Sequence, residues 1–319
     1  MTVYDHIDHN RRITALILVL FPLTLFLLTV CVCLLLVKLE ILGNTGGPRL
    51  FSDSMRAAAA AFPFIAGAAL IWMFFSYMRG DDIILGAAGA REITYSDDPK
   101  LYSMVENVAI MAGLPTPKIY AIDDESLNAF ATGRKPETAS VAFTTGIVSK
   151  LKPNELESVI AHEMAHIGNR DTMLMIIIVT GIAMFTFLAE FIFRLALRGG
   201  GSRSKKSGQG RLILFIIALA LWIFGVFIAP LIRMALSRNR EFLADATAAR
   251  ITHNPDALAD ALMEISKDPR VEVLDSRPLM GALCVANPLS GSSLTASLFA
   301  THPSIEDRVD RLCKMARDL

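Results

Sequence analysis

Four long apolar runs constrain this 319-residue chain more than any other feature of its sequence. Residues 13–37 and 57–78 each continue without a charged side chain for long enough to cross a bilayer core, which takes about 20 helical residues. Residues 172–189 and 212–232 are two further candidate spans. Hydrophobic residues reach 53% of the chain and the mean hydropathy is +0.47. We therefore expect a helical membrane protein rather than a wholly soluble one.

The ends of two of these runs are ambiguous. Arg11 and Arg12 precede the first run, as they would in a cleaved export signal, but the run is too long and no small-residue cleavage site follows it. An uncleaved anchor is the better interpretation. Glu190 and Arg194 follow the third run at a four-residue spacing, which either pairs them on the helix or ends the span.

Charge and cysteine content exclude several classes of protein. The formal net charge is zero, so the chain has no electrostatic footprint for nucleic acid, and we expect no such partner. Cys31 and Cys33 lie in the first apolar run, whereas Cys284 and Cys313 are isolated. Without a CxxC pair, neither a zinc knuckle nor a disulfide framework is expected, and a reducing compartment is compatible with this.

The motif that carries chemistry is the HExxH run at residues 162–166. On a helix, His162 and His166 share a face and can bind one Zn²⁺, while Glu163 is placed to act on water. Lone histidines on an apolar stripe usually belong to a core, but a buried His pair with an intervening Glu is costly unless something binds it. Asn154 and Glu157 form a candidate N-cap and capping-box pair for this helix.

A catalytic zinc site needs a third protein ligand, and residues 237–246 offer one. Glu241 and Asp245 are four residues apart and share a helix face. Glu241 could bind the metal while Asp245 accepts a hydrogen bond from a ligand imidazole. A solvated helix with a ladder of charges is the alternative, and it would be preferred if HExxH were absent.

The catalytic part of the chain is expected to be divided by an apolar hairpin. A helix around residues 101–111 and strands at 118–122 and 140–143 precede the HExxH helix, and residues 234–319 have a helical pattern. We predict four parts: a two-helix membrane anchor (1–79), the first part of the catalytic domain (80–171), a hydrophobic helical hairpin (172–233) and the second part with the third ligand (234–319).

Taken together, these motifs resemble the HtpX-type membrane zinc metalloproteases, bacterial relatives of the Ste24 prenyl-protein proteases. The resemblance covers nearly the whole chain and includes Asn128–Gly133 (NAFATG) and His302-Pro303. It implies an α-helical membrane protein with an α+β zincin-like (gluzincin) metalloprotease domain. It also implies one Zn²⁺ per chain, with Glu241 as the third ligand, and a transition-state role for His302, although His302-Pro303 could equally start a helix. The residues that it places near the substrate cleft are Asn128, Ala129, Phe130, Ala131 and Thr132.

The expected activity is zinc-dependent cleavage of peptide bonds, with Glu163 taking a proton from water and returning one to the leaving amine. An extended substrate could pair with an edge strand near residues 128–132. His166 lies only six residues before the third apolar run, which favours substrates at the surface of the lipid bilayer. The resemblance implies quality control of misfolded or unassembled membrane proteins at their cytoplasmic, membrane-proximal segments. It further implies a multi-pass protein of the bacterial inner membrane whose active site faces the cytoplasm.

Two other classes of function remain open on the sequence alone. A zinc-binding membrane scaffold without turnover would need a fourth protein ligand to close the site, and the sequence offers no obvious one. A transporter that uses Glu190 and Arg194 as intramembrane charges would explain the spans but would leave HExxH without a role.

Overall fold

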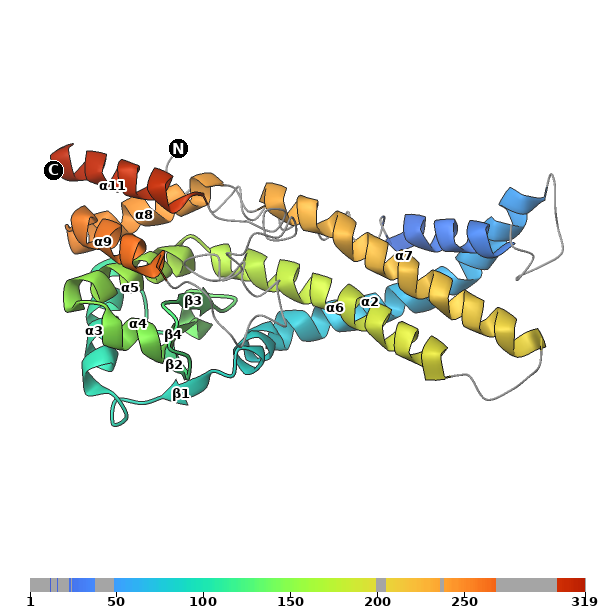
Figure 1. Ribbon diagram of the computed structural model, residues 1–319, viewed down its shortest axis with the longest axis horizontal. Coiled ribbons are helices and arrows are strands. Elements are labelled where there is room, and N and C mark those ends of the chain that lie inside the picture. Colours follow the sequence, from blue (N-terminus) through green and yellow to red (C-terminus); the bar gives the residue numbers. More distant parts are fainter. Residues whose placement is uncertain are drawn as a thin grey trace. The chain divides into compact units, whose positions relative to one another are not determined.

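The computed structural model describes most of the chain, and Figure 1 shows its helices and strands. Its contacts divide the chain into two compact units. The first unit contains Tyr77–Val179 and Ile232–Leu319, and the second contains Arg11–Ser76 and Thr180–Leu231. The described residues are 12, 16, 23, 25–37, 49–198, 205–235, 238–267 and 303–318.

A four-stranded mixed sheet lies in the first unit, in the order β1-β2-β4-β3. Its strands are β1 (Arg91–Ile93), β2 (Lys118–Ile122), β3 (Ala129–Thr132) and β4 (Ser140–Thr144). β2 and β4 pair in parallel at the centre of the sheet. At the two edges, β1 pairs antiparallel with β2, and β3 pairs antiparallel with β4. The two strands predicted from the sequence are confirmed as β2 and β4, and β3, which follows Asn128, lies at an edge of the described sheet.

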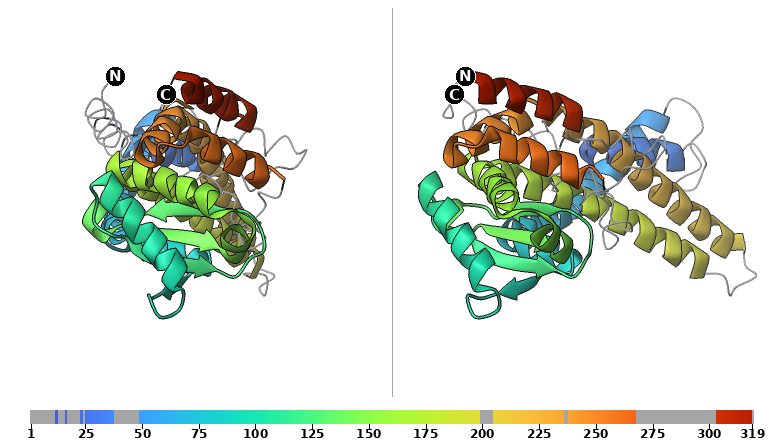
Figure 2. Two further views of the ribbon diagram at one scale, coloured as in Figure 1. Left: turned by 90° about the vertical axis from the view of Figure 1, so that its left-hand side faces the viewer. Right: turned by 60° about the vertical axis from the view of Figure 1, so that its left-hand side comes forward.

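One face of the sheet carries the main core of the first unit. Side chains alternate along β4, so Val141 and Phe143 point to this face while Ala142 points to the other. Helices α3 (Pro99–Ala112) and α5 (Pro153–Gly168) supply the apolar residues that cover it (Figure 2). The helix predicted around residues 101–111 is confirmed as α3.

The opposite face is covered by parts of two apolar helices. The last turns of α2 (Leu50–Ala87) contribute Ile84 and Leu85, and the first turns of α6 (Asp171–Arg198) contribute Ile176 and Val179. These residues pack with Ile122, Phe130 and Ala142 of the sheet. The sheet therefore has apolar cover on both faces, which explains why its strands are buried almost throughout.

Helix α5 begins earlier than the sequence suggested. Its N-cap is Lys152 rather than Asn154, and Pro153 is its first residue. The backbone N–H of Lys152 donates to Glu155 at 2.9 Å, so Glu155, not Glu157, closes the capping box. Proline is well suited to the first helical position because its φ is fixed and its missing N–H would have no partner there.

The described parts of residues 234–319 are helical, as predicted. They form α8 (Arg238–Thr252), α9 (Pro255–Ile265) and α11 (Ile305–Asp318). α8 and α9 both contact α5, and α11 contacts α8 and α9. The short α4 (Thr145–Lys150) connects β4 to α5, and a 3-10 turn, Pro136–Thr138, connects β3 to β4. The HExxH helix α5 is therefore packed between α3, which precedes it in the sequence, and α8 and α9, which follow it.

Among the described residues, two helices are long and apolar enough to cross a membrane, α2 and the part of α6 over Asp171–Leu197. Shorter apolar helical stretches are Leu25–Val37 and, within α7 (Lys205–Ala235), Gly210–Gly225. The predicted runs at 57–78, 172–189 and 212–232 thus lie in α2, α6 and α7. The run at 13–37 is described mainly over its second half.

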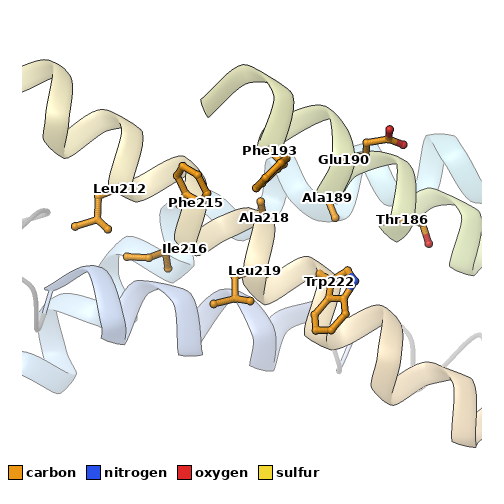
Figure 3. A pocket seen from close by; sticks show the side chains of 10 residues that line it. All are labelled: Thr186, Ala189, Glu190, Phe193, Leu212, Phe215, Ile216, Ala218, Leu219 and Trp222. Carbon is orange, nitrogen blue, oxygen red and sulfur yellow. The ribbon is translucent and has the colours of Figure 1, made fainter. Parts of the chain in front are cut away.

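In the second unit, α6 and α7 enclose an apolar pocket of about 700 Å³ (Figure 3). Apart from the Trp222 indole, only Thr186 and Glu190 bring polar side-chain atoms to its lining. Glu190 pairs with Arg194 on α6, and the helix continues to Arg198, so this ion pair does not end the helix. The pocket lining lacks the convergent polar groups that catalysis requires.

Candidate active site

The two histidines of the HExxH motif meet on one face of α5. His162 and His166 are one helical turn apart, and their Nε2 atoms are 3.1 Å from each other. The His162 side chain is fully buried, and that of His166 is 15% exposed. Burial lowers the pKa of His162 and so favours the neutral imidazole, which is the form that binds a metal.

Helix α8 brings Glu241 to the same point. Its carboxylate oxygens lie 3.7 Å from His162 Nε2 and 3.8 Å from His166 Nε2. Tetrahedral coordination with zinc–ligand bonds of about 2.0–2.1 Å separates the ligand atoms by about 3.4 Å, close to these distances. The three side chains therefore fit a zinc ion and leave one coordination position for water. Within the described part of the chain, no other group of His, Cys, Asp and Glu is arranged in this way.

Glu163 lies beside this cluster and is almost fully buried. Burial raises the pKa of its carboxyl group to about 7, and the carboxylate of Glu241 adds to this effect. The positive charge of His166 and a hydrogen bond from the backbone N–H of Ala131 act in the opposite direction. A carboxyl group with a pKa near neutrality can both accept and release a proton at physiological pH.

Asp245, predicted to accept a hydrogen bond from a ligand imidazole, lies against the ring of His162. Its Oδ1 is 3.0 Å from His162 Nδ1, on the side of the ring away from Nε2. Burial alone would raise the pKa of Asp245, but the guanidinium of Arg308 and the His162 ring outweigh it and lower the pKa to about 2. Asp245 is therefore a carboxylate at neutral pH and can fix the orientation of the imidazole.

Arg308 on α11 also belongs to the site, and it was not predicted from the sequence. Its Nε and Nη2 donate to the two carboxylate oxygens of Asp245 at 2.8 and 2.7 Å, and Nη1 lies 3.9 Å from Glu241. Its side chain is only 1% exposed. A signal was present in the sequence, because position 308 lies on the apolar face of the helix formed by Ile305 and Leu312. A charged residue on such a face needs a buried partner.

Asp171 and Arg240 were also missed. Asp171 Oδ2 is 2.9 Å from His166 Nδ1, and Arg240 Nε is 3.5 Å from the other oxygen of Asp171. Burial acts to lower the pKa of His166, but the carboxylates of Glu241 and Asp171 outweigh it and raise the pKa to about 9. The available signal was a carboxylate immediately after the HExxH helix, at the start of an apolar run.

The segment expected at the substrate cleft adjoins the site through its strand. Asn128 is buried, and its side-chain oxygen accepts a hydrogen bond from the N–H of Ala129. Ala129, Phe130, Ala131 and Thr132 form β3, which contacts α5. Within this strand, the backbone N–H of Ala131 donates to the Glu163 carboxylate. His302 lies outside the described residues.

A mixed α+β unit, an HExxH helix and a glutamate from a later helix define a zincin-type metalloprotease, and the long apolar helices mark it as a membrane protein. A model of peptidase family M48 matches residues 96–316, and the chain belongs to this family. The expected resemblance, fold class and enzyme class are thereby confirmed.

Curated relatives match the chain over most of its length. A "Protease HtpX homolog" of Bacteroides fragilis is 36% identical over 307 residues, which cover 95% of each chain. One of Dictyoglomus thermophilum is 37% identical over 314 residues, 98% of this chain and 95% of the relative. The crystal structure of S. mikatae Ste24p aligns with a TM-score of 0.45 and 18% identity, over 82% of this chain and 65% of that one.

Proposed function

We propose that this membrane metalloprotease is a zinc-dependent endopeptidase that holds one Zn²⁺ per chain through His162, His166 and Glu241. The observation that supports the proposal most strongly is the distance between the three potential ligand groups, all of whose ligand atoms lie within 4.8 Å of one another. A fourth protein ligand would favour a structural site, but the described residues offer none at this position. An open coordination position is typical of a catalytic site.

The proton transfers are assigned to Glu163. When bound, zinc lowers the pKa of water to about 7 and polarises the scissile carbonyl. Glu163 accepts the proton of the attacking water and passes a proton to the leaving amine, a double role that suits its raised pKa. We keep His302 as the proposed donor to the developing oxyanion, on the basis of the family resemblance.

As an edge strand of the described sheet, β3 suits an extended polypeptide. Among the described residues it pairs with β4 on one side, and the backbone N–H of Ala131 donates to Glu163. A substrate that adds as a further strand is held by main-chain hydrogen bonds, which tolerate many side chains. We propose Asn128–Thr132 as the substrate-binding segment, because main-chain pairing suits unfolded substrates of varied sequence.

The position of the site relative to α6 supports membrane-protein substrates. α6 is long enough to span a bilayer and begins at Asp171, five residues after His166. Peptide segments close to the bilayer surface would reach such a site most easily. On the resemblance to HtpX-type proteases, we propose that the site faces the cytoplasm of a bacterial inner membrane. There the protein would remove misfolded or unassembled membrane proteins.

The test combines metal content with cleavage by the detergent-solubilised, full-length protein. We expect about one zinc per chain and cleavage of casein that is lost after chelation and regained when zinc is added. Zinc without cleavage would instead support the scaffold, in which the ligands are structural. Absence of both metal binding and cleavage would contradict the zinc site and favour the transporter alternative.

A further inference from the structure

The ring of His166 is held from both sides. Its Nε2 faces His162 and Glu241, where zinc is proposed to bind, and its Nδ1 lies 2.9 Å from Asp171 Oδ2. A histidine that binds a metal through Nε2 carries its proton on Nδ1 and usually donates it to an oxygen. Asp171 occupies the position of that acceptor, so it can fix both the tautomer and the plane of the ring.

Asp171 is itself held by Arg240. Arg240 Nε lies 3.5 Å from Asp171 Oδ1, and the two side chains are 7% and 2% exposed. Because burying a carboxylate is costly without a counter-charge, the nearby guanidinium offsets part of the cost of placing Asp171 in the interior. Arg240 also directly precedes Glu241, so one turn of α8 carries a proposed zinc ligand and the support for another.

The supports of the two histidines have the same parts, a carboxylate and an arginine, although Arg240 lies farther from Asp171 than Arg308 does from Asp245. His162 is backed by Asp245, which is held by Arg308 at 2.7 and 2.8 Å. On the opposite side of the site, His166 is backed by Asp171 and Arg240. In each case a buried arginine fixes the carboxylate that orients a zinc ligand.

The turn between α5 and α6 places Asp171 beside His166. In an uninterrupted helix, residue 171 would lie about 140° around the axis from residue 166 and could not face its ring. Instead α5 ends, and Arg170 adopts a left-handed conformation with φ 62°. This conformation is unfavourable for a residue with a Cβ atom. Thr172 then donates to the carbonyl of Gly133 at 2.7 Å, which fixes the first turn of α6 with Asp171 beside His166.

We propose that Asp171 and Arg240 are positioning residues that orient the zinc ligand His166. This inference rests on the proposed zinc site and adds to it a dependence on the membrane hairpin. The first turn of α6, the helix that leads into the apolar hairpin, becomes part of the metal centre. Zinc affinity then depends on the position of that turn relative to His166.

The first test is the zinc affinity of the full-length protein in detergent, measured against a fluorescent chelator. Asp171→Asn keeps the size of the side chain but removes its charge, and we expect zinc to bind about 10–100-fold more weakly. The cobalt-substituted variant should also show displaced visible absorption bands, because the His166 ring is no longer fixed. The control is Asp98→Asn at the start of α3, where Asp98 accepts from the backbone N–H of Leu101 and should leave zinc affinity unchanged.

The second test is a double-mutant cycle with Arg240→Gln. If Arg240 acts through Asp171, Arg240→Gln alone weakens zinc binding and the double variant binds little more weakly than Asp171→Asn. Arg250→Gln, at an exposed position of the same helix, is the matched control. Should Asp171→Asn fail to fold, Arg240→Gln decides alone: weaker zinc binding and a changed cobalt spectrum support the proposal, and wild-type values overturn it.

Failure of this inference can be distinguished from failure of the proposed function. If the wild-type protein binds no zinc, the proposed function fails. If the wild type binds zinc and both variants bind it equally well, with the wild-type cobalt spectrum, the zinc site stands and the positioning role is wrong. Fully additive effects in the cycle would likewise contradict action of Arg240 through Asp171.

Discussion

Arg308 shows how strongly single residues determine this site. Its side chain is the largest by volume among the fully buried side chains that the structure describes. It makes two hydrogen bonds to Asp245 and lies within 3.9 Å of Glu241. Such a buried ion pair adds little net stability compared with an apolar pair, but removal of one partner leaves the other charge buried and uncompensated.

We predict that Arg308→Met destabilises the metal-free protein by about 3–5 kcal/mol, because the carboxylates of Asp245 and Glu241 lose their counter-charge. Chemical denaturation of the metal-free protein measures the free energy of unfolding. Arg317→Met, at an exposed position in the last turn of α11, is the control and should change it by less than about 0.5 kcal/mol. A loss below about 1 kcal/mol for Arg308→Met would contradict this account of the site.

The sequence predicts site residues that are defined by local spacing and misses residues whose role depends on contacts between distant segments. His162, Glu163 and His166 lie within one helical turn, so their spacing alone defines the geometry. Glu241 and Asp245 were found because the chemistry required a further ligand. Asp171, Arg240 and Arg308 are recognisable only by their contacts with residues on other helices, and such contacts leave no local periodicity in the sequence.

Among the elements, the connections are less predictable than the strands and helices that they join. The β-rich composition of the segments that form β2 and β4 predicted both strands, whereas β1 has three residues and pairs only with β2 among the described strands. The start of α5 differed by two residues because Pro153 was not treated as the first residue of the helix. Close backbone approaches are the least visible, and Gly146 at the start of α4 is the clearest example.

We predict that Gly146→Ala destabilises the first unit by about 1–3 kcal/mol or more, as expected for overpacking against backbone. A Cβ atom at this position would lie 2.0 Å from the carbonyl oxygen of Glu125 and 2.4 Å from that of Ser126. The matched control is Gly168→Ala in α5, whose Cβ would meet only Leu114 Cδ1, at 3.7 Å. Thermal unfolding of both variants checks the prediction, and an equal effect of the two substitutions would refute it.

For the whole molecule, the membrane topology depends on whether the hairpin of α6 and α7 crosses the bilayer. Glu241 shares a site with His162 and His166, so the segments before and after the hairpin lie on one membrane face. Both hairpin helices therefore cross or neither does. Crossing places five basic residues on the outer face, against the usual bias of basic residues towards the cytoplasm: Arg198, Arg203, Lys205, Lys206 and Arg211. Arg211 donates to the carbonyl of Ala196 at 2.9 Å, in the last turn of α6. The helix dipole favours a positive charge at this C-terminal end.

We propose a crossing hairpin, consistent with four parts at residues 1–79, 80–171, 172–233 and 234–319. We predict that Ser204→Cys, in a background without the four native cysteines, reacts with a membrane-impermeant thiol reagent in intact cells. A cysteine introduced at Ser149, in the proposed cytoplasmic part, is the matched control and should react only after lysis. Labelling of position 204 only after lysis would show that the hairpin does not cross.

In the proposed mechanism, zinc at His162, His166 and Glu241 supports peptide hydrolysis with Glu163 as the proton acceptor. The most direct measurement is the zinc content and the casein-cleavage rate of Glu163→Gln, purified beside the wild type. We expect the variant to keep about one zinc per chain and to lose cleavage by several powers of ten, because the ligands are intact and only the base is removed. Cleavage at the wild-type rate by the zinc-loaded variant would contradict it.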